Sequence, residues 1–262
     1  MNLWTYLLHL AGSGAVAYVT AANLRDSKTR PNVLAGFQLA ESGSVPFLQA
    51  LSQRAANEGN SWLAERLTCH AQDEQRHGQI FAQALKRLNK QVIDFNNLAK
   101  TNPESEPTER RRSPFFEAYF EGYGSEQLSP QTIDWMVFFA STYILELDAS
   151  KEFARMARAL PDDAASIALQ KGLFSVASDE TGHAAYLYEA MQRCAPDTVV
   201  EAAIAQWRTR KVNALFAMVG NLWQRSGKFP SMVQDGISPE MASLVEDPIE
   251  AESAVVSVPT RV

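Results

Sequence analysis

The chain contains the same five-residue pattern twice, and each copy follows a lone glutamate at almost the same distance. The two copies are Asp73-Glu74-Gln75-Arg76-His77 and Asp179-Glu180-Thr181-Gly182-His183. Glu41 lies 33 residues before the glutamate of the first copy, and Glu146 lies 34 residues before that of the second. The repeat predicts two helical hairpins, each with one glutamate on its first helix and a Glu-x-x-His pair on its second.

The spacing within each copy places a carboxylate and an imidazole on the same side of a helix. Residues three apart are neighbours on one helix face, so each pair can approach a metal ion from one direction. Hard carboxylate oxygens with imidazole nitrogens favour iron or manganese, whereas a structural zinc site usually uses cysteine or more histidine. Two divalent cations would also balance four buried carboxylates. The predicted ligands of this two-metal site are Glu41, Glu74, His77, Glu146, Glu180 and His183.

The alternative explanation is a pair of solvated helix faces that repeat by chance. A single Glu-x-x-His is weak evidence, because it occurs in many helices. However, the chain has only four histidines, and two of them close the same pattern. Random placement rarely produces this, so the metal site is the preferred interpretation.

Hydrophobic periodicity predicts four bundle helices that carry these ligands inward. The first runs from residue 31 to about 57, the second follows the turn at 57–60, the third starts at Ser129-Pro130, and the fourth follows 161–163. Glu41 and Glu74 lie about 24 Å and about 21 Å from their shared turn at the helical rise, so both reach the same level. On the third helix, the same periodicity assigns Asp148 and Glu152 to a solvated face.

Composition divides the chain into three predicted segments. Residues 1–30 form an apolar helical extension, 31–228 the bundle with a crossover insert at 91–128 and a fifth helix, and 229–262 an acidic, poorly structured tail. The first 24 residues carry no charged side chain. They pack against the bundle or a partner subunit, such as a second copy in a homodimer, or they make weak contact with a membrane surface. His9 in this stretch is read as a structural histidine.

The net charge indicates which partners the protein can bind, and the cysteine content indicates its cellular compartment. A net charge of −6 gives no electrostatic footprint for nucleic acid. Cys69 and Cys194 are the only cysteines, which excludes a disulfide framework and a cysteine-rich metal knuckle. The default compartment is therefore the cytoplasm.

Residues 31–194 resemble the ferritin-like superfamily of non-haem dinuclear-iron carboxylate proteins. The resemblance rests on the ligand pattern, in this order: Glu41, Glu74-x-x-His77, Glu146 and Glu180-x-x-His183. The resemblance implies an all-α, ferritin-like four-helix bundle with a long crossover between its second and third helices, plus additional N-terminal and C-terminal helices. The first copy is similar to the Asp-Glu-x-Arg-His form of bacterial multicomponent monooxygenases and desaturases. The second copy departs from that form, because Gly182 stands in place of the arginine.

The resemblance also assigns roles to the aspartates before each ligand pair. It implies that Asp73 and Asp179 accept hydrogen bonds from imidazole N–H groups and so orient the histidines. A contact with the histidine four residues later on the same helix is one arrangement, and simple surface charge is the alternative. His70 lies on the same helix face as the ligands, one turn before Glu74. It could support a ligand or be a spare ligand, but a structural role is the preferred interpretation.

The function implied is that of an O2-activating dinuclear iron oxidoreductase, either an oxygenase or an oxidase. It would act on a small, hydrophobic organic substrate with an external electron donor; the cofactor would be Fe/Fe, with Mn/Fe as the other choice. Tyr143, one turn before Glu146, could donate a hydrogen bond or an electron, or be a core residue. Ferroxidase or iron-handling activity without an organic substrate is the alternative, and metal held only for structure is the third reading.

Overall fold

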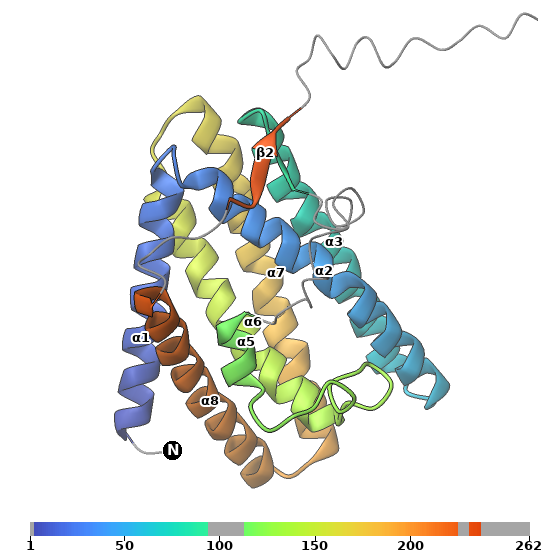
Figure 1. The fold of residues 1–262 in the computed structure, drawn as a ribbon. Coiled ribbons are helices and arrows are strands. Elements are labelled where there is room, and N and C mark those ends of the chain that lie inside the picture. The colour runs from blue at the N-terminus through green and yellow to red at the C-terminus, as the bar shows by residue number, and fades with distance from the viewer. Residues whose placement is uncertain (1–2, 94–112, 225–230, 237–262) are drawn as a thin grey trace, which may run out of the picture.

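The computed structural model describes residues 3–93, 113–224 and 231–236, and these are almost entirely helical (Figure 1). The predicted all-α class is confirmed, since the strands are two segments of three residues. In chain order the elements are α1 (Leu3–Arg25), α2 (Arg30–Asn57), α3 (Ser61–Arg87), β1 (Lys90–Val92), α5 (Pro114–Tyr119), α6 (Trp135–Ala159), α7 (Ala164–Cys194), α8 (Asp197–Gln224) and β2 (Val233–Asp235).

Two helical hairpins, α2–α3 and α6–α7, form the centre of the fold (Figure 1). The first turn closes at Gly59, whose φ of 78° suits glycine, and Asn60 then caps α3 by accepting a hydrogen bond from the backbone N–H of Leu63. Asp163 caps α7 in the same way through the N–H of Ser166. The hairpins meet where α3 packs against α7, which brings the two Glu-x-x-His helices together.

The third bundle helix begins later than predicted. α6 starts at Trp135, and Asp134 caps it by accepting a hydrogen bond from the backbone N–H of Val137. The prediction of a start at Ser129-Pro130 was wrong, because Ser129 and Thr132 bond to each other through their hydroxyls in a turn that precedes the helix. Of the crossover insert, residues 94–112 lie outside the described part of the chain, and the short aromatic helix is α5.

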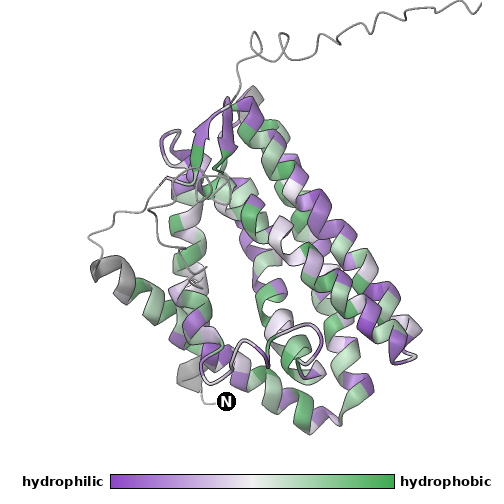
Figure 2. Ribbon diagram, turned by 45° about the vertical axis from the view of Figure 1, so that its right-hand side comes forward, coloured by the Kyte–Doolittle hydropathy of each residue, from purple (hydrophilic) through white to green (hydrophobic). Residues whose placement is uncertain are grey.

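The four bundle helices bury two apolar clusters, one on each side of the level where the predicted ligands lie. Hydrophobic residues recur along these helices, as expected for amphipathic segments (Figure 2). On α2, for example, Leu34 belongs to one cluster and Leu48 to the other, and Glu41 lies between them in sequence. The same order holds on α3, where Leu67 and Phe81 flank the ligand pair. The polar residues are therefore enclosed by hydrophobic layers along the bundle axis.

Helices α1 and α8 cover α6 from outside, and this overturns one expectation for α6 (Figure 1). Asp148 is 6% exposed and lies at the junction of the three helices, so the assignment of this residue to a solvated face was wrong. Its Oδ2 accepts hydrogen bonds from Lys211 Nζ at 2.6 Å and Ser13 Oγ at 3.2 Å, and it lies 3.2 Å from His9 Nε2. Burial opposes ionisation, but His9 and Lys211 hold the pKa of Asp148 well below its ordinary value.

The outer face of α1 is apolar and exposed. Leu7 and Leu8 are almost half exposed, and Tyr18 is 77% exposed. Residues Leu7–Arg25 form the one segment of the described chain that is long and apolar enough to cross a membrane, judged by length and composition. Packing of α1 on α6 and α8 accounts for its buried face. The weak membrane contact and the homodimer stay predictions for its exposed face.

A small sheet closes one end of the bundle. β1 and β2 pair antiparallel, with Gln91 opposite Gln234. Three residues of the tail, predicted to be poorly structured, thus form a strand against the segment that follows α3. Residues 225–230 and 237–262, which include most of that tail, lie outside the described chain.

Gly172 in α7 lies against Ile80 in α3, at the contact between the hairpins. A Cβ on Gly172 would lie 2.6 Å from Ile80 Cγ2, and the β-branched isoleucine has few rotamers with which to move away. Gly172→Ala is therefore expected to lower the free energy of unfolding by about 1–3 kcal/mol. Gly182→Ala, in the same helix, meets nothing within 4 Å and should raise it by about 0.5–1 kcal/mol. Urea denaturation measures both; an equal gain in the two variants would contradict the close approach.

Candidate metal centre

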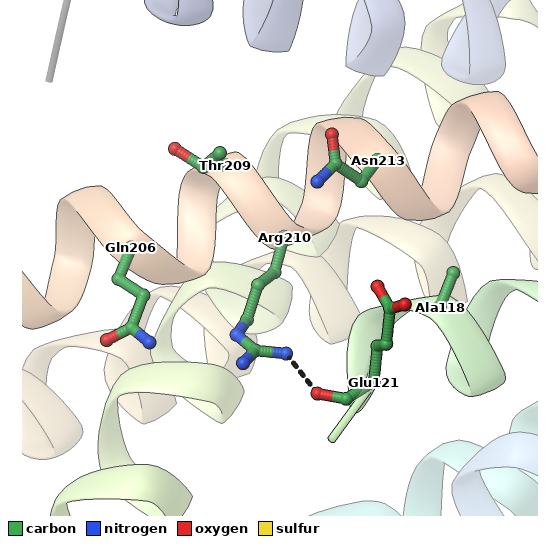
Figure 3. Close-up of a pocket in the computed structure, with 6 residues that line it drawn as sticks. All are labelled: Ala118, Glu121, Gln206, Thr209, Arg210 and Asn213. Atoms are coloured by element: carbon green, nitrogen blue, oxygen red, sulfur yellow. Dashed lines mark hydrogen bonds between the residues drawn. The ribbon is translucent and has the colours of Figure 1, made fainter. Parts of the chain in front are cut away.

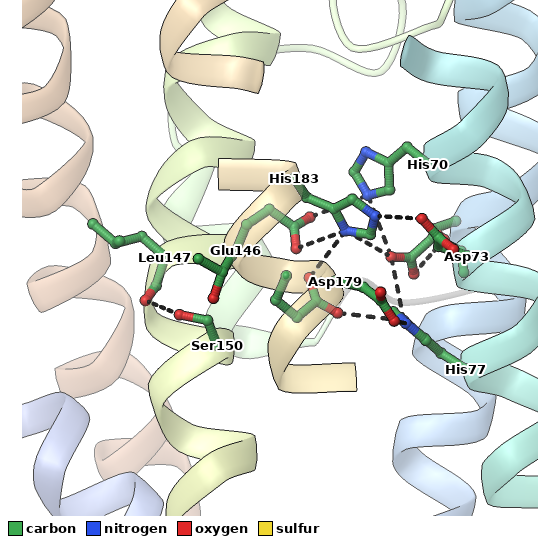
Figure 4. Close-up of polar contacts among 12 residues, drawn as sticks. His70, Asp73, His77, Glu146, Leu147, Ser150, Asp179 and His183 are labelled. Carbon is green, nitrogen blue, oxygen red and sulfur yellow. Dashed lines mark hydrogen bonds and ion pairs between the residues drawn. The ribbon is translucent and has the colours of Figure 1, made fainter. Parts of the chain in front are cut away.

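The structure brings all six predicted ligands together between the two hairpins. Figure 4 labels His77, Glu146 and His183 among them. Glu41 comes from α2, Glu146 from α6, and each of α3 and α7 contributes its Glu-x-x-His pair. Their side chains are buried or nearly so, with His77 fully enclosed. The ligand atoms fall into two groups of four, each small enough to surround one cation: Glu41, Glu74, His77 and Glu180 form the first group, and His70, Glu74, Glu146 and His183 form the second.

The first group is centred on His77. Its Nδ1 lies 3.5 Å from Glu41 Oε2, 3.4 Å from Glu180 Oε1 and 3.8 Å from Glu74 Oε1. This nitrogen is buried and makes no hydrogen bond. A buried ring nitrogen without a partner, facing three carboxylates, is what a metal-binding imidazole needs.

The second group lies beside the first and shares Glu74 with it. His183 Nδ1 lies 3.3 Å from Glu180 Oε2 and 3.8 Å from both Glu74 Oε1 and Glu146 Oε2. In both groups most of these separations exceed an ordinary hydrogen bond. They approach the spacing of about 3.0–3.5 Å between neighbouring ligands that each lie about 2.1 Å from one cation. The residues present therefore fit a metal centre.

The electrostatics of the two groups show how strongly they would hold positive charge. Burial alone would lower the pKa of His77, but the neighbouring carboxylates of Glu180, Glu41 and Asp179 raise it to about 10. Burial and repulsion from Glu146 raise the pKa of Glu180 to about 7. The carboxylates around these histidines therefore favour positive charge at the imidazoles. Cations bound between the same groups would replace protons on the imidazoles.

The two aspartates contact the histidines crosswise between the hairpins. Asp179 Oδ2 accepts from His77 Nε2 at 3.1 Å, and Asp73 Oδ2 lies 3.3 Å from His183 Nε2, so each aspartate faces the histidine of the other helix. The structure thus shows contacts across the helices and not the contact within one helix. Each contact keeps the proton on the outer ring nitrogen, which leaves Nδ1 free to bind metal.

Arg76 joins the two aspartates and explains how the second copy does without an arginine. Its Nη2 donates to Asp73 Oδ1 at 2.9 Å and to Asp179 Oδ2 at 2.5 Å, and its Nη1 donates to Ser175 Oγ. One guanidinium therefore serves both copies of the pattern. Gly182, in the position of the second arginine, leaves open space.

Substitution of Arg76 tests this shared role. Arg76→Met removes the donor from both aspartates, and we expect the affinity for both metal ions to fall by about 10- to 100-fold, as for other residues that orient ligands. Arg76→Lys should lose nearly as much, because one ammonium cannot reproduce the planar fork. Competition with a chelator measures the affinities. Arg66→Met, on the exposed side of the same helix, is the control; equal affinities in all four proteins would show that Arg76 supports neither histidine.

Sequence reasoning missed two polar residues that contact the groups. Ser44 lies one turn after Glu41, and its hydroxyl is 3.0 Å from Glu74 Oε2 and 2.6 Å from the Glu41 carbonyl. Tyr186 lies three residues after His183, and its hydroxyl is 2.7 Å from His70 Nδ1. Helical spacing from the ligands was the signal that could have found both.

Tyr143 contacts another tyrosine, Tyr188 in α7. It is partly buried, and its ring centroid lies 5.7 Å from that of Tyr188. Burial raises its pKa. The tyrosine whose hydroxyl contacts a residue of the two groups is Tyr186. The role suggested for Tyr143 stays a prediction.

A pocket of about 490 Å³ lies elsewhere, between α5 and α8 (Figure 3). Arg210 lines it and donates hydrogen bonds to the backbone carbonyls of Tyr119 and Glu121. None of its lining residues belongs to either ligand group: Ala118, Glu121, Gln206, Thr209, Arg210 and Asn213.

Comparisons with protein-family models, with curated proteins and with solved structures found no match to this chain. The metal centre therefore rests on the residues and their geometry. Those observations establish buried glutamate and histidine groups that could bind a metal ion.

Proposed function

We propose that the protein is a dinuclear non-haem iron oxidoreductase of ferritin-like design, which activates O2 to oxidise a small organic substrate. The observation that carries this proposal is the pair of buried ligand groups that share Glu74. Four carboxylates balance two divalent cations, and the mixture of carboxylates and imidazoles favours iron or manganese. Two bound ferrous ions would supply two electrons to O2, and an external donor would restore them.

The chain's own residues define how such a centre is held. Glu74 belongs to both groups, so it would help to hold an ion in either one. Asp73 and Asp179 fix the ring orientation of His183 and His77, and Arg76 forms an ion pair with each aspartate. The apolar clusters on either side keep water from the ligands, so that their electrostatic interactions stay strong.

The side of the centre that carries Arg76 is open to solvent. Its side chain is 42% exposed, while those of Asp73 and Asp179 are 34% and 25% exposed. The aspartates therefore stand between the histidines and bulk water. This side is the natural entry for O2 and for iron.

A second candidate function is iron oxidation without an organic substrate. One observation favours it: Phe37, Phe81 and Phe153 pack against one another, with ring centroids separated by 5.1–5.9 Å. They belong to the apolar core and do not line the pocket between α5 and α8.

Oxygen consumption separates these functions. Protein loaded anaerobically with ferrous iron is mixed with O2 in a stopped-flow cell, and O2 uptake is followed with and without added reductant. The proposed oxidoreductase should stop after one turnover until reductant is supplied. A ferroxidase would continue with each addition of ferrous iron and accumulate ferric product. No uptake by the loaded protein would contradict both and indicate a structural metal.

A further inference from the structure

The two ligand groups are chemically unequal, although the sequence repeat predicts one histidine for each. The first group has three carboxylates and the single imidazole of His77. The second has two carboxylates and two imidazoles, those of His183 and His70. Glu180 Oε2 also lies 3.3 Å from His183 Nδ1, so the clearest difference between the groups is the additional imidazole of His70, which stands outside both Glu-x-x-His pairs.

His70 is positioned like a ligand. It is 2% exposed, and its Nε2 lies 3.3 Å from Glu74 Oε1 and 3.5 Å from Glu146 Oε1. Its ring stacks on that of His183, with 3.7 Å between the centroids. These separations match those that His77 and His183 make with their own carboxylates.

The outer nitrogen of His70 also has the partner that a ligand histidine requires. An imidazole that binds metal through one nitrogen keeps its proton on the other and donates it to an acceptor. His77 and His183 face Asp179 and Asp73 in this way. His70 Nδ1 faces the hydroxyl of Tyr186 at 2.7 Å, inside the protein. All three histidines thus present one nitrogen to the carboxylates and the other to an oxygen.

We infer that His70 is a seventh metal ligand, oriented by Tyr186, and that it makes the two metal positions unequal in affinity. The inference rests on the proposed metal centre and deepens it. The position with two imidazoles binds ions that favour nitrogen, such as Co²⁺ or Fe²⁺, and fills first. The position with three carboxylates fills second and is the better one for Mn²⁺.

Cobalt titration tests the loading order. Wild-type protein should bind two Co²⁺ ions in two resolved steps, followed by calorimetry and by the visible absorption of the cobalt. His70→Ala should weaken the first step by more than about 100-fold, beyond the effect of a residue that only supports a ligand. His70→Gln keeps the volume and a polar group near Tyr186, and it should weaken the first step to a similar extent. This variant replaces His70→Ala in the test if the alanine variant folds poorly.

Tyr186→Phe tests the orienting contact. We expect it to weaken the same step by about 10- to 100-fold and to shift the signal of the His70 ring N–H. Tyr188→Phe, two residues further along α7, is the matched control and should change neither, since its ring packs against Tyr143.

Proton NMR of the cobalt-loaded protein counts the coordinating imidazoles directly. Three exchangeable, paramagnetically shifted N–H signals are expected for the wild type, and two for His70→Gln. Two signals in the wild type, or unchanged cobalt affinity in His70→Gln, would overturn the inference while leaving the metal centre intact. Failure of the wild type to bind two ions would instead overturn the proposed function, and this inference with it.

Discussion

Replacement of Glu74 by alanine is expected to abolish binding of both metal ions, because Glu74 belongs to both ligand groups. Its Oε1 lies within 3.8 Å of the metal-facing nitrogens of His70, His77 and His183. We expect a loss of more than about 100-fold in affinity at each position, larger than that for residues that only orient ligands. Equilibrium dialysis followed by metal analysis gives the number of ions bound per chain.

The controls for Glu74 separate a shared ligand from an ordinary one. Glu65→Ala, on an exposed turn of the same helix, should leave both ions bound. Glu41→Ala and Glu146→Ala each remove a residue of one group, so each should weaken chiefly one ion. Retention of one ion at wild-type affinity in Glu74→Ala would show that Glu74 is not shared.

Replacement of Lys211 by alanine is expected to lower the free energy of unfolding by about 3–5 kcal/mol, because it leaves Asp148 charged and buried without its closest cation. Both side chains are 8% exposed, and Lys211 Nζ lies 2.6 Å from Asp148 Oδ2. This ion pair links α8 to α6, and His9 and Ser13 of α1 contact the same carboxylate. Chemical denaturation of the metal-free protein measures the loss.

A double variant shows whether the loss comes from the unpaired charge. Asp148→Leu with Lys211→Met removes both charges and keeps the volume, so most of the lost stability should return. Glu189→Ala, which breaks an exposed pair with Arg193, should change stability by less than about 1 kcal/mol. A small effect of Lys211→Ala, similar to that of Glu189→Ala, would contradict a buried pair.

The inward placement of the ligands could be predicted from the sequence because it depends on local geometry. Three-residue spacing fixes which side chains share a helix face, and the equal arm lengths fix their level. The structure accordingly brings Glu41, Glu74, Glu146 and Glu180 together between the hairpins. The helical period and the lengths of the helices were sufficient to predict that these side chains meet.

The contacts between helices could not be predicted in the same way. Whether Asp73 faces His77 or His183 depends on the register of α3 against α7, which no spacing within one helix defines. The pairing of His70 with Tyr186 depends on the same register. Arg76 could be assigned to one copy of the pattern, but its contact with Asp179 required the second hairpin to be in place.

The error at Asp148 has a different physical cause. Amphipathic analysis assumes that a helix has one buried face and one solvated face. α6 is buried on two sides, because α1 and α8 pack against the face that the bundle leaves free. Asp148 can be charged on that buried face because Lys211 of α8 lies opposite and pairs with it. The sequence of α6 alone does not show this partner.

Mössbauer spectroscopy with EPR, on protein loaded anaerobically with ⁵⁷Fe and then exposed to O2, shows whether one chain forms a dinuclear iron centre. We expect two irons per chain and, after oxidation, a diamagnetic ground state from coupling between ferric ions bridged by carboxylate. A single iron per chain, or isolated high-spin ferric ions visible by EPR, would contradict it.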